Sequence, residues 1–143
     1  MYRRILVALD HTKADESLLP HIAALAALTR AELLLVHVAD GWAARNYDRL
    51  KLVESEEMRE DREYLERTAL EMRERHGLTV SSVLALGDPP REILRLSEES
   101  RCDLIAMTTH GHRLIGDILF GSTIDYVRHR SKTPLLIVSP KTS

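Results

Sequence analysis

The residues best suited to chemistry lie in one segment of the C-terminal third, where glycines and hydroxyl residues follow an apolar run. Gly111, Gly121, Ser122 and Thr123 come after the run Leu104 to Met107. Glycine lets a ligand approach the backbone closely, and the free amide groups at a helix start bind anions. If a helix opens directly after Gly121, these residues form a cradle for phosphate, and a nucleotide is the natural ligand to expect.

The elements that must position this cradle are five apolar segments separated by helical ones. We expect strands at 4–9, 32–38, 79–86, 103–108 and 134–139, and helices at 15–30, 53–76, 90–99 and 121–130. The run Leu104 to Met107 is continuous rather than alternating, which is typical of a parallel strand covered on both faces. Strands that alternate with helices predict an α/β fold with a doubly wound parallel sheet, formed by a single domain at 1–143.

Three segments of the sequence depart from a simple alternation of strands and helices. Pro20 lies inside the first helical segment, so that helix either starts later or is kinked, because proline removes a hydrogen bond. The segment 40–52 contains Trp42 and Tyr47 without a clear period, and we expect it to be a long loop. The helix at 53–76 has a narrow apolar stripe, and we assign its many charges to the solvated surface.

Topology predicts the same location for a ligand as the cradle does. In an open α/β sheet, ligands bind at the carboxyl ends of the strands where the strand order reverses. With right-handed crossovers and the order 3-2-1-4-5, the reversal lies between the first and fourth strands. Asp10 follows the first of these strands and Thr108 ends the other. The alternation of elements does not by itself determine this order.

Other site types fit the sequence less well. Gly111 to Asp117 imitates the glycine spacing of a P-loop, but Asp117 stands where the lysine should be and would repel phosphate. His110 and His112 have no acidic or cysteine partner at a matching spacing, so we predict no metal site. Ser122 has no identified base, which argues against nucleophilic catalysis.

The composition excludes several partner classes. The net charge of −2 offers no bulk attraction to nucleic acid or to an anionic membrane. No apolar run approaches the roughly 20 residues that span a bilayer, and no signal-peptide pattern opens the chain. Cys102 is the single cysteine, so no intrachain disulfide can form, and we expect it to be buried. His37 is expected to be a core histidine with its hydrogen bonds satisfied. The prediction is a cytoplasmic protein.

The sequence also resembles a known family, the universal stress proteins. Gly111, nine intervening residues and Gly121-Ser122 match the second part of that family's nucleotide motif, G-x2-G-x9-G-[ST], whose first glycine is Thr108 here. The resemblance covers essentially the whole chain. Its other matching segments are Ile5 to Asp10, Val36 to Val38, Gly87 to Pro89, Thr109 to Gly111 and Pro134 to Val138.

This resemblance implies a Rossmann-like fold of the adenine nucleotide alpha hydrolase type that binds ATP or AMP, with or without Mg²⁺. Asp10 would contact ribose or adenine, and the Val38 backbone would contact adenine. The phosphates would lie against glycines and hydroxyl residues. The complete set of implied contacts is Ala8, Asp10, Val38, Thr108, Gly111, Gly121, Ser122 and Thr123. The resemblance also implies a homodimer paired through the last strand, Leu135 to Val138.

Three functional readings follow. The first is a nucleotide-responsive regulatory or stress-response module that hydrolyses ATP slowly at most. The second is a genuine ATPase, which the missing lysine, arginine finger and general base argue against. Arg113 could contact phosphate in either case, although an exposed loop arginine is more often simply solvated. The third is a dimeric stress protein that binds no nucleotide, because the Thr108 methyl group narrows the ligand's approach.

Overall fold

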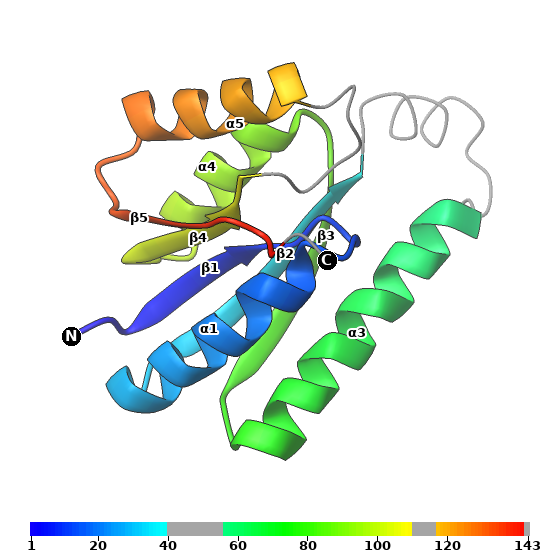
Figure 1. Ribbon diagram of the computed structural model, residues 1–143, viewed down its shortest axis with the longest axis vertical. Helices are drawn as coiled ribbons and strands as arrows, with labels where there is room; N and C mark the ends of the chain where they lie inside the picture. Colours follow the sequence, from blue (N-terminus) through cyan, green and yellow to red (C-terminus); the bar gives the residue numbers. More distant parts are fainter. Residues whose placement is uncertain (40–55, 110–116, 142–143) are drawn as a thin grey trace.

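A computed structural model describes residues 1–39, 56–109 and 117–141, with side chains outside 117–122. Its centre is a five-stranded parallel sheet of order β3-β2-β1-β4-β5, which confirms the predicted α/β fold and strand order (Figure 1). The strands are β1 (Arg4–Ala8), β2 (Glu32–Ala39), β3 (Val80–Leu86), β4 (Leu104–Thr108) and β5 (Leu135–Val138). The helices are α1 (Asp15–Thr29), α3 (Glu56–His76), α4 (Pro89–Glu99) and α5 (Asp117–Arg130).

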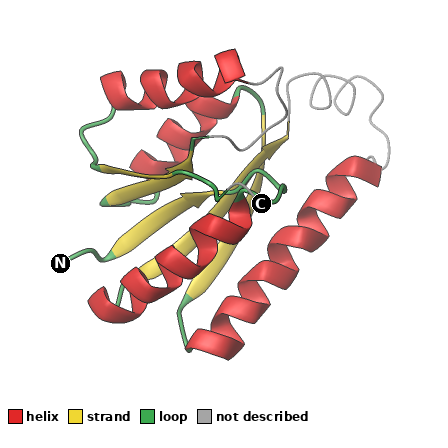
Figure 2. Ribbon diagram, viewed as in Figure 1, coloured by secondary structure: helices red, strands yellow, loops and turns green. Residues whose placement is uncertain are grey.

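Helices cover both faces of the sheet, α1 and α3 on one side and α4 and α5 on the other (Figures 1 and 2). Successive side chains of a strand point to opposite faces, so each strand contributes to both packed layers. Ile5 and Val7 of β1 pack with α1 and α3, whereas Leu6 and Ala8 pack with α4 and α5. Burial on both faces explains the unbroken apolar runs within the inner strands β1, β2 and β4.

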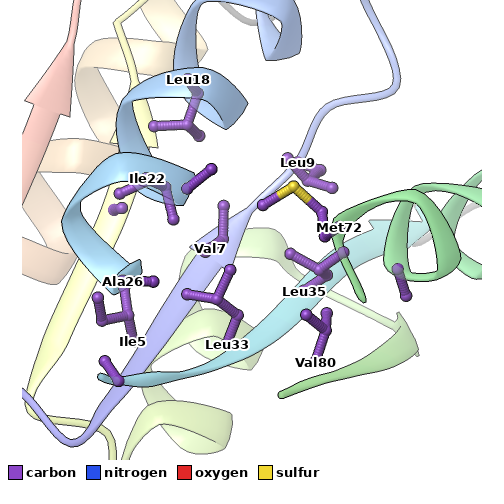
Figure 3. Close-up of a cluster of buried hydrophobic side chains, with 14 of the residues drawn as sticks. Ile5, Val7, Leu9, Leu18, Ile22, Ala26, Leu33, Leu35, Met72 and Val80 are labelled. Carbon is purple, nitrogen blue, oxygen red and sulfur yellow. The ribbon is translucent and has the colours of Figure 1, made fainter. Parts of the chain in front are cut away.

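Among the described side chains, the layer between the sheet, α1 and α3 holds the larger of the two buried clusters. Leu18 and Ile22 of α1 pack over Val7 of β1 and Leu33 of β2, as Figure 3 shows. From α3, Met72 packs against the same layer near Leu35. Val7, Leu18, Ile22 and Leu35 are fully buried, so this layer holds both helices against the sheet.

The first helix does not start after Pro20. It begins at Asp15 and continues through Pro20, which corrects one of the two predicted alternatives. The residues on either side explain this outcome. Leu18 and Ile22 are both completely buried, and packing of that face outweighs the roughly 3 kcal/mol cost of an interior proline.

The last helix begins one turn earlier than predicted. It opens at Asp117 rather than after Gly121, so Gly121 lies inside the helix. The prediction was wrong because a single glycine costs a helix only about 1 kcal/mol and does not have to end it. As a consequence, the amides at Ser122 and Thr123 lie beyond the first turn, whose N–H groups are the ones left free.

The other boundaries lie within one or two residues of the predicted ones, as is usual for element ends. The expected loop at 40–52 and the first residues of the helix at 53–76 lie outside the described residues. None of the helices that the structure describes is long and apolar enough to cross a membrane.

Cys102 is 7% exposed, as predicted, and lies just before β4. Burial raises the pKa of its thiol to about 11, with a contribution from neighbouring Asp103. We therefore expect the native protein to react with a thiol reagent such as DTNB far more slowly than the urea-unfolded chain does, because the thiolate is the reactive form. Equal rates in the two states would contradict this prediction.

Candidate functional site

The carboxyl ends of β1 and β4 meet at the point where the strand order reverses. Ile5 and Val7 of β1 are in register with Leu104 and Ala106 of β4. Thr108, the last residue of β4, is 3% exposed, and its hydroxyl donates a hydrogen bond of 3.3 Å to Asp10 Oδ2. The structure thus brings together two residues that are far apart in the chain.

Ala8 and Val38 belong to the same edge of the sheet. Ala8 is the last residue of β1 and is in register with Val36 of β2. The Leu9 amide continues this pairing by donating to the Val36 carbonyl at 2.7 Å. Val38 lies two residues beyond Val36, as Asp10 lies two beyond Ala8, so the two expected nucleoside contacts end neighbouring strands.

A buried hydroxyl group without a partner lies directly after β4. Within the part of the chain that the structure describes, Thr109 Oγ1 is buried and makes no hydrogen bond. A buried polar atom without a hydrogen-bond partner costs free energy. Such atoms are therefore usually paired with protein, with water or with a bound ligand. Thr109 directly follows Thr108 in the chain, so its hydroxyl is a candidate hydrogen-bonding group for a ligand at the strand-order reversal.

The expected phosphate contacts are only partly described. Gly111 and Arg113 lie outside the described residues, as do His110 and His112. Gly121 and Ser122 are described only as backbone within α5, and Thr123 is half-buried in the same helix. Because α5 begins at Asp117, a phosphate bound at this helix start would contact backbone amides of the turn that begins there.

Asp15, the first residue of α1, fixes the turn that carries Asp10. It is 1% exposed, and its carboxylate accepts hydrogen bonds from the amides of Asp10 at 3.0 Å and His11 at 2.9 Å. Tyr64 of α3 donates its hydroxyl to the same carboxylate at 2.6 Å. Burial and the neighbouring Asp15 raise the pKa of Tyr64 above its usual range, so the phenol stays a neutral donor.

A second buried carboxylate, Asp61 of α3, lies between two histidines. Asp61 Oδ1 is 2.7 Å from His11 Nδ1, and Asp61 Oδ2 is 3.3 Å from His37 Nε2. His37 Nδ1 lies 2.8 Å from the Leu9 carbonyl oxygen, which can only accept. His37 is therefore the satisfied histidine that the sequence predicted. We call His11, His37 and Asp61 the Asp61 bridge.

Burial and hydrogen bonding shift the pKa values of Asp61 and His37 in opposite directions. Burial disfavours both ions, but for Asp61 the hydrogen bonds from His37 and His11 outweigh it and hold the pKa of the carboxyl below its usual range. For His37, burial is likewise outweighed by Asp61 and the Leu9 carbonyl, so the pKa of the imidazole is raised. Both nitrogens of His37 face acceptors, which favours the doubly protonated ring.

The sequence patterns did not indicate the roles of Asp15, Asp61 and Tyr64, and the assignment of the α3 charges to the solvated surface was wrong for Asp61. Asp61 is only 8% exposed. A signal for it existed, because Asp61 falls at helical spacing between Met58 and Leu65 on the apolar stripe of α3. A carboxylate at such a position has to find partners inside the fold.

His11 has an unusual backbone conformation and an aromatic neighbour. Its φ of 61° lies in the left-handed region, which residues other than glycine rarely adopt. Its ring stacks on Tyr64, with the centroids 4.1 Å apart. A strained backbone conformation persists only where surrounding contacts stabilise it. For His11 these contacts come from Asp15 of α1 and from Asp61 and Tyr64 of α3. Despite this gathering of titratable groups, no set of three or more within the described ranges has the geometry to hold a metal ion.

The chain belongs to the universal stress protein family, whose pattern matches residues 1–139. It is similar to universal stress protein MJ0577 of Methanocaldococcus jannaschii, with 28% identity over all of this chain and 98% of that protein. The solved structure of MJ0577 superimposes with a TM-score of 0.77 and 29% identity, covering 100% of this chain and 99% of that one.

Two further solved relatives carry nucleotides. A universal stress protein in complex with cAMP has a TM-score of 0.69 at 21% identity, covering 96% of this chain and 97% of that one. A universal stress protein from Archaeoglobus fulgidus in complex with dAMP also has a TM-score of 0.69, at 22% identity over 95% and 97% of the two chains. At these identities the likeness establishes the shared fold.

Proposed function

We propose that this protein binds an adenine nucleotide, ATP or AMP, in the crevice at the carboxyl ends of β1, β2 and β4, and acts as a regulatory stress-response module. The observation that carries the proposal is the meeting of Asp10 and Thr108 at the strand-order reversal, beside the unpaired buried hydroxyl of Thr109. The relatives with cAMP and dAMP support an adenine nucleotide as the ligand class.

In this proposal, different structural elements contact different parts of the nucleotide. Asp10 and the Val38 backbone suit the ribose and adenine, because they end adjacent strands. The backbone amides at the start of α5 suit phosphate, with Mg²⁺ as a counterion for ATP. Gly111, Gly121, Ser122, Thr123 and Arg113 remain proposed phosphate contacts. A homodimer paired through β5 and a cytoplasmic location complete the proposal.

Calorimetric titration of the protein with AMP, and with ATP and Mg²⁺, tests this function. ATP at 100 times its dissociation constant should raise the unfolding free energy by about 2.7 kcal/mol. At roughly 2–4 °C per kcal/mol for a chain of this size, the melting temperature should rise by several degrees. Asp10→Ala should weaken binding by about 1–3 kcal/mol, because a charged acceptor is lost.

One specific observation favours the alternative, a stress protein that binds no nucleotide. Thr108 stands at the first glycine of the family motif, and its hydroxyl already bonds to Asp10 Oδ2 at 3.3 Å. If neither nucleotide produces heat or a melting shift with the parent, but Thr108→Gly binds one of them, this alternative is the correct function. Binding by the parent excludes it.

A further inference from the structure

The Asp61 bridge connects the two backbone segments that the proposed site uses. His11 directly follows Asp10, and His37 directly precedes Val38. Asp61 approaches one histidine with each carboxylate oxygen, at 2.7 Å and 3.3 Å. His37 also donates to the Leu9 carbonyl at 2.8 Å, so the ends of β1 and β2 are joined twice, directly and through α3.

Packing of α3 does not require a carboxylate at this position. Met58, Leu65 and Met72 of α3 are already buried at 5% exposure or less, and they hold the helix against the sheet. Burial of an ion pair contributes little net stability, since an apolar residue of similar volume commonly does as well. The carboxylate of Asp61 is therefore better explained by what it positions than by how firmly it attaches α3.

We propose that Asp61 is a positioning residue of the adenine nucleotide site, which holds Asp10 and Val38 in their binding arrangement through His11 and His37. This inference rests on the proposed function and deepens it, because it couples nucleotide affinity to the protonation of His37. The coupling follows from the geometry, since only a doubly protonated His37 can donate to Asp61 and to the Leu9 carbonyl together.

The groups around His37 determine the direction of this coupling. Among the described residues, Asp61 faces it from α3, and Asp10 and the Leu9 carbonyl act on it from the end of β1. The ring of His11 lies edge-on with its centroid 6.4 Å away, and the neighbouring residue on β3 is Leu84. The pKa of His37 is raised. The Asp61 bridge, with His37 donating to both Asp61 and the Leu9 carbonyl, is therefore complete below that pKa and is weakened as the pH rises through it.

The test compares the parent with Asp61→Asn, which keeps the shape of the side chain and removes its charge. Both proteins are titrated calorimetrically with AMP and with ATP and Mg²⁺ from about pH 5.5 to pH 8.5. The matched control is Glu60→Gln, which removes an exposed carboxylate from the adjacent position of α3. Circular dichroism and melting temperature show whether each variant is folded.

We expect the dissociation constant of Asp61→Asn to be about tenfold higher than that of the parent, the factor expected for one lost charge-assisted hydrogen bond. The affinity of the parent should fall as the pH rises through the pKa of His37, and in Asp61→Asn the midpoint of this fall should move to lower pH. A purely structural role would lower affinity equally at every pH. Glu60→Gln should behave as the parent does.

The outcomes separate the inference from the function on which it rests. If the parent binds neither nucleotide, the proposed function is wrong and the inference is overturned with it. If the parent binds and folded Asp61→Asn has the same dissociation constant and pH midpoint, only the inference is overturned.

Should Asp61→Asn not fold, histidine NMR titration of the parent gives the answer. By reciprocity, bound nucleotide must then raise the pKa of His37. An unchanged His37 pKa in the complex would contradict the proposed role.

Discussion

Asp15→Ala should lower the free energy of unfolding by about 3–5 kcal/mol, because it leaves three donors without their common acceptor. Those donors are the amides of Asp10 and His11 and the hydroxyl of Tyr64, all within 3.0 Å of the carboxylate. Asp15 is only 1% exposed and the three hydrogen bonds are part-buried, so water can replace the lost oxygens only in part. Urea unfolding, monitored by circular dichroism, measures the change.

Two variants separate the loss of these hydrogen bonds from a general effect at the start of α1. Asp15→Asn keeps one acceptor oxygen and should cost distinctly less than alanine. Glu16→Ala changes the exposed neighbour in the same helical turn and should shift stability by no more than about 0.5 kcal/mol. A loss below about 1 kcal/mol for Asp15→Ala would show that the three contacts contribute little.

Ile105→Ala should destabilise the fold by about 2–5 kcal/mol, the range for removing a large aliphatic side chain from a core. Ile105 is 0% exposed in β4, between Leu6 of β1 and Leu135 of β5. Its side chain packs in the cluster beneath α4 and α5, where rigid strands on both sides limit collapse into the cavity. Denaturant unfolding with an unchanged m-value measures this loss.

The size of the cavity can be varied to test this explanation. Ile105→Val removes one methylene group and should cost about 0.5–1.5 kcal/mol. Leu28→Ala on α1 removes a side chain that is 83% exposed and should be close to neutral. If Ile105→Ala and Leu28→Ala have equal effects, packing between β4 and its neighbours does not govern stability.

The inner strands β1, β2 and β4 were predictable because each contains a short unbroken apolar run, as is typical of parallel strands covered on both faces. The order of the strands in the sheet was not predictable, because alternation of strands and helices is compatible with several arrangements. The pairing of β1 with both β2 and β4 depends on contacts such as Ile5 with Leu104, which no local pattern encodes. The order 3-2-1-4-5 was an assumption at that stage, and the structure confirms it.

The candidate site was predictable only where it depends on strand ends. Asp10 and Thr108 meet because they follow neighbouring parallel strands, which topology alone implies. Asp61 could not be assigned in the same way, because its partners come from β2 and from the turn after β1. A helix start was also placed too late at Gly121, because glycine is an ambiguous signal inside a helix.

The central position of β1 has a consequence for how the chain folds during synthesis. β1 precedes the other described elements in the chain, and its neighbour β4 follows only after α1, β2, α3, β3 and α4 have been made. Until Leu104–Thr108 leaves the ribosome, one edge of β1 lacks the strand that pairs with it in the fold, although its residues from Ile5 onward are apolar. Unpaired apolar edges associate with other chains, and contacts so distant in sequence form slowly. We therefore expect the nascent chain to expose an apolar strand edge until β4 is added, and association with other chains is favoured during that interval.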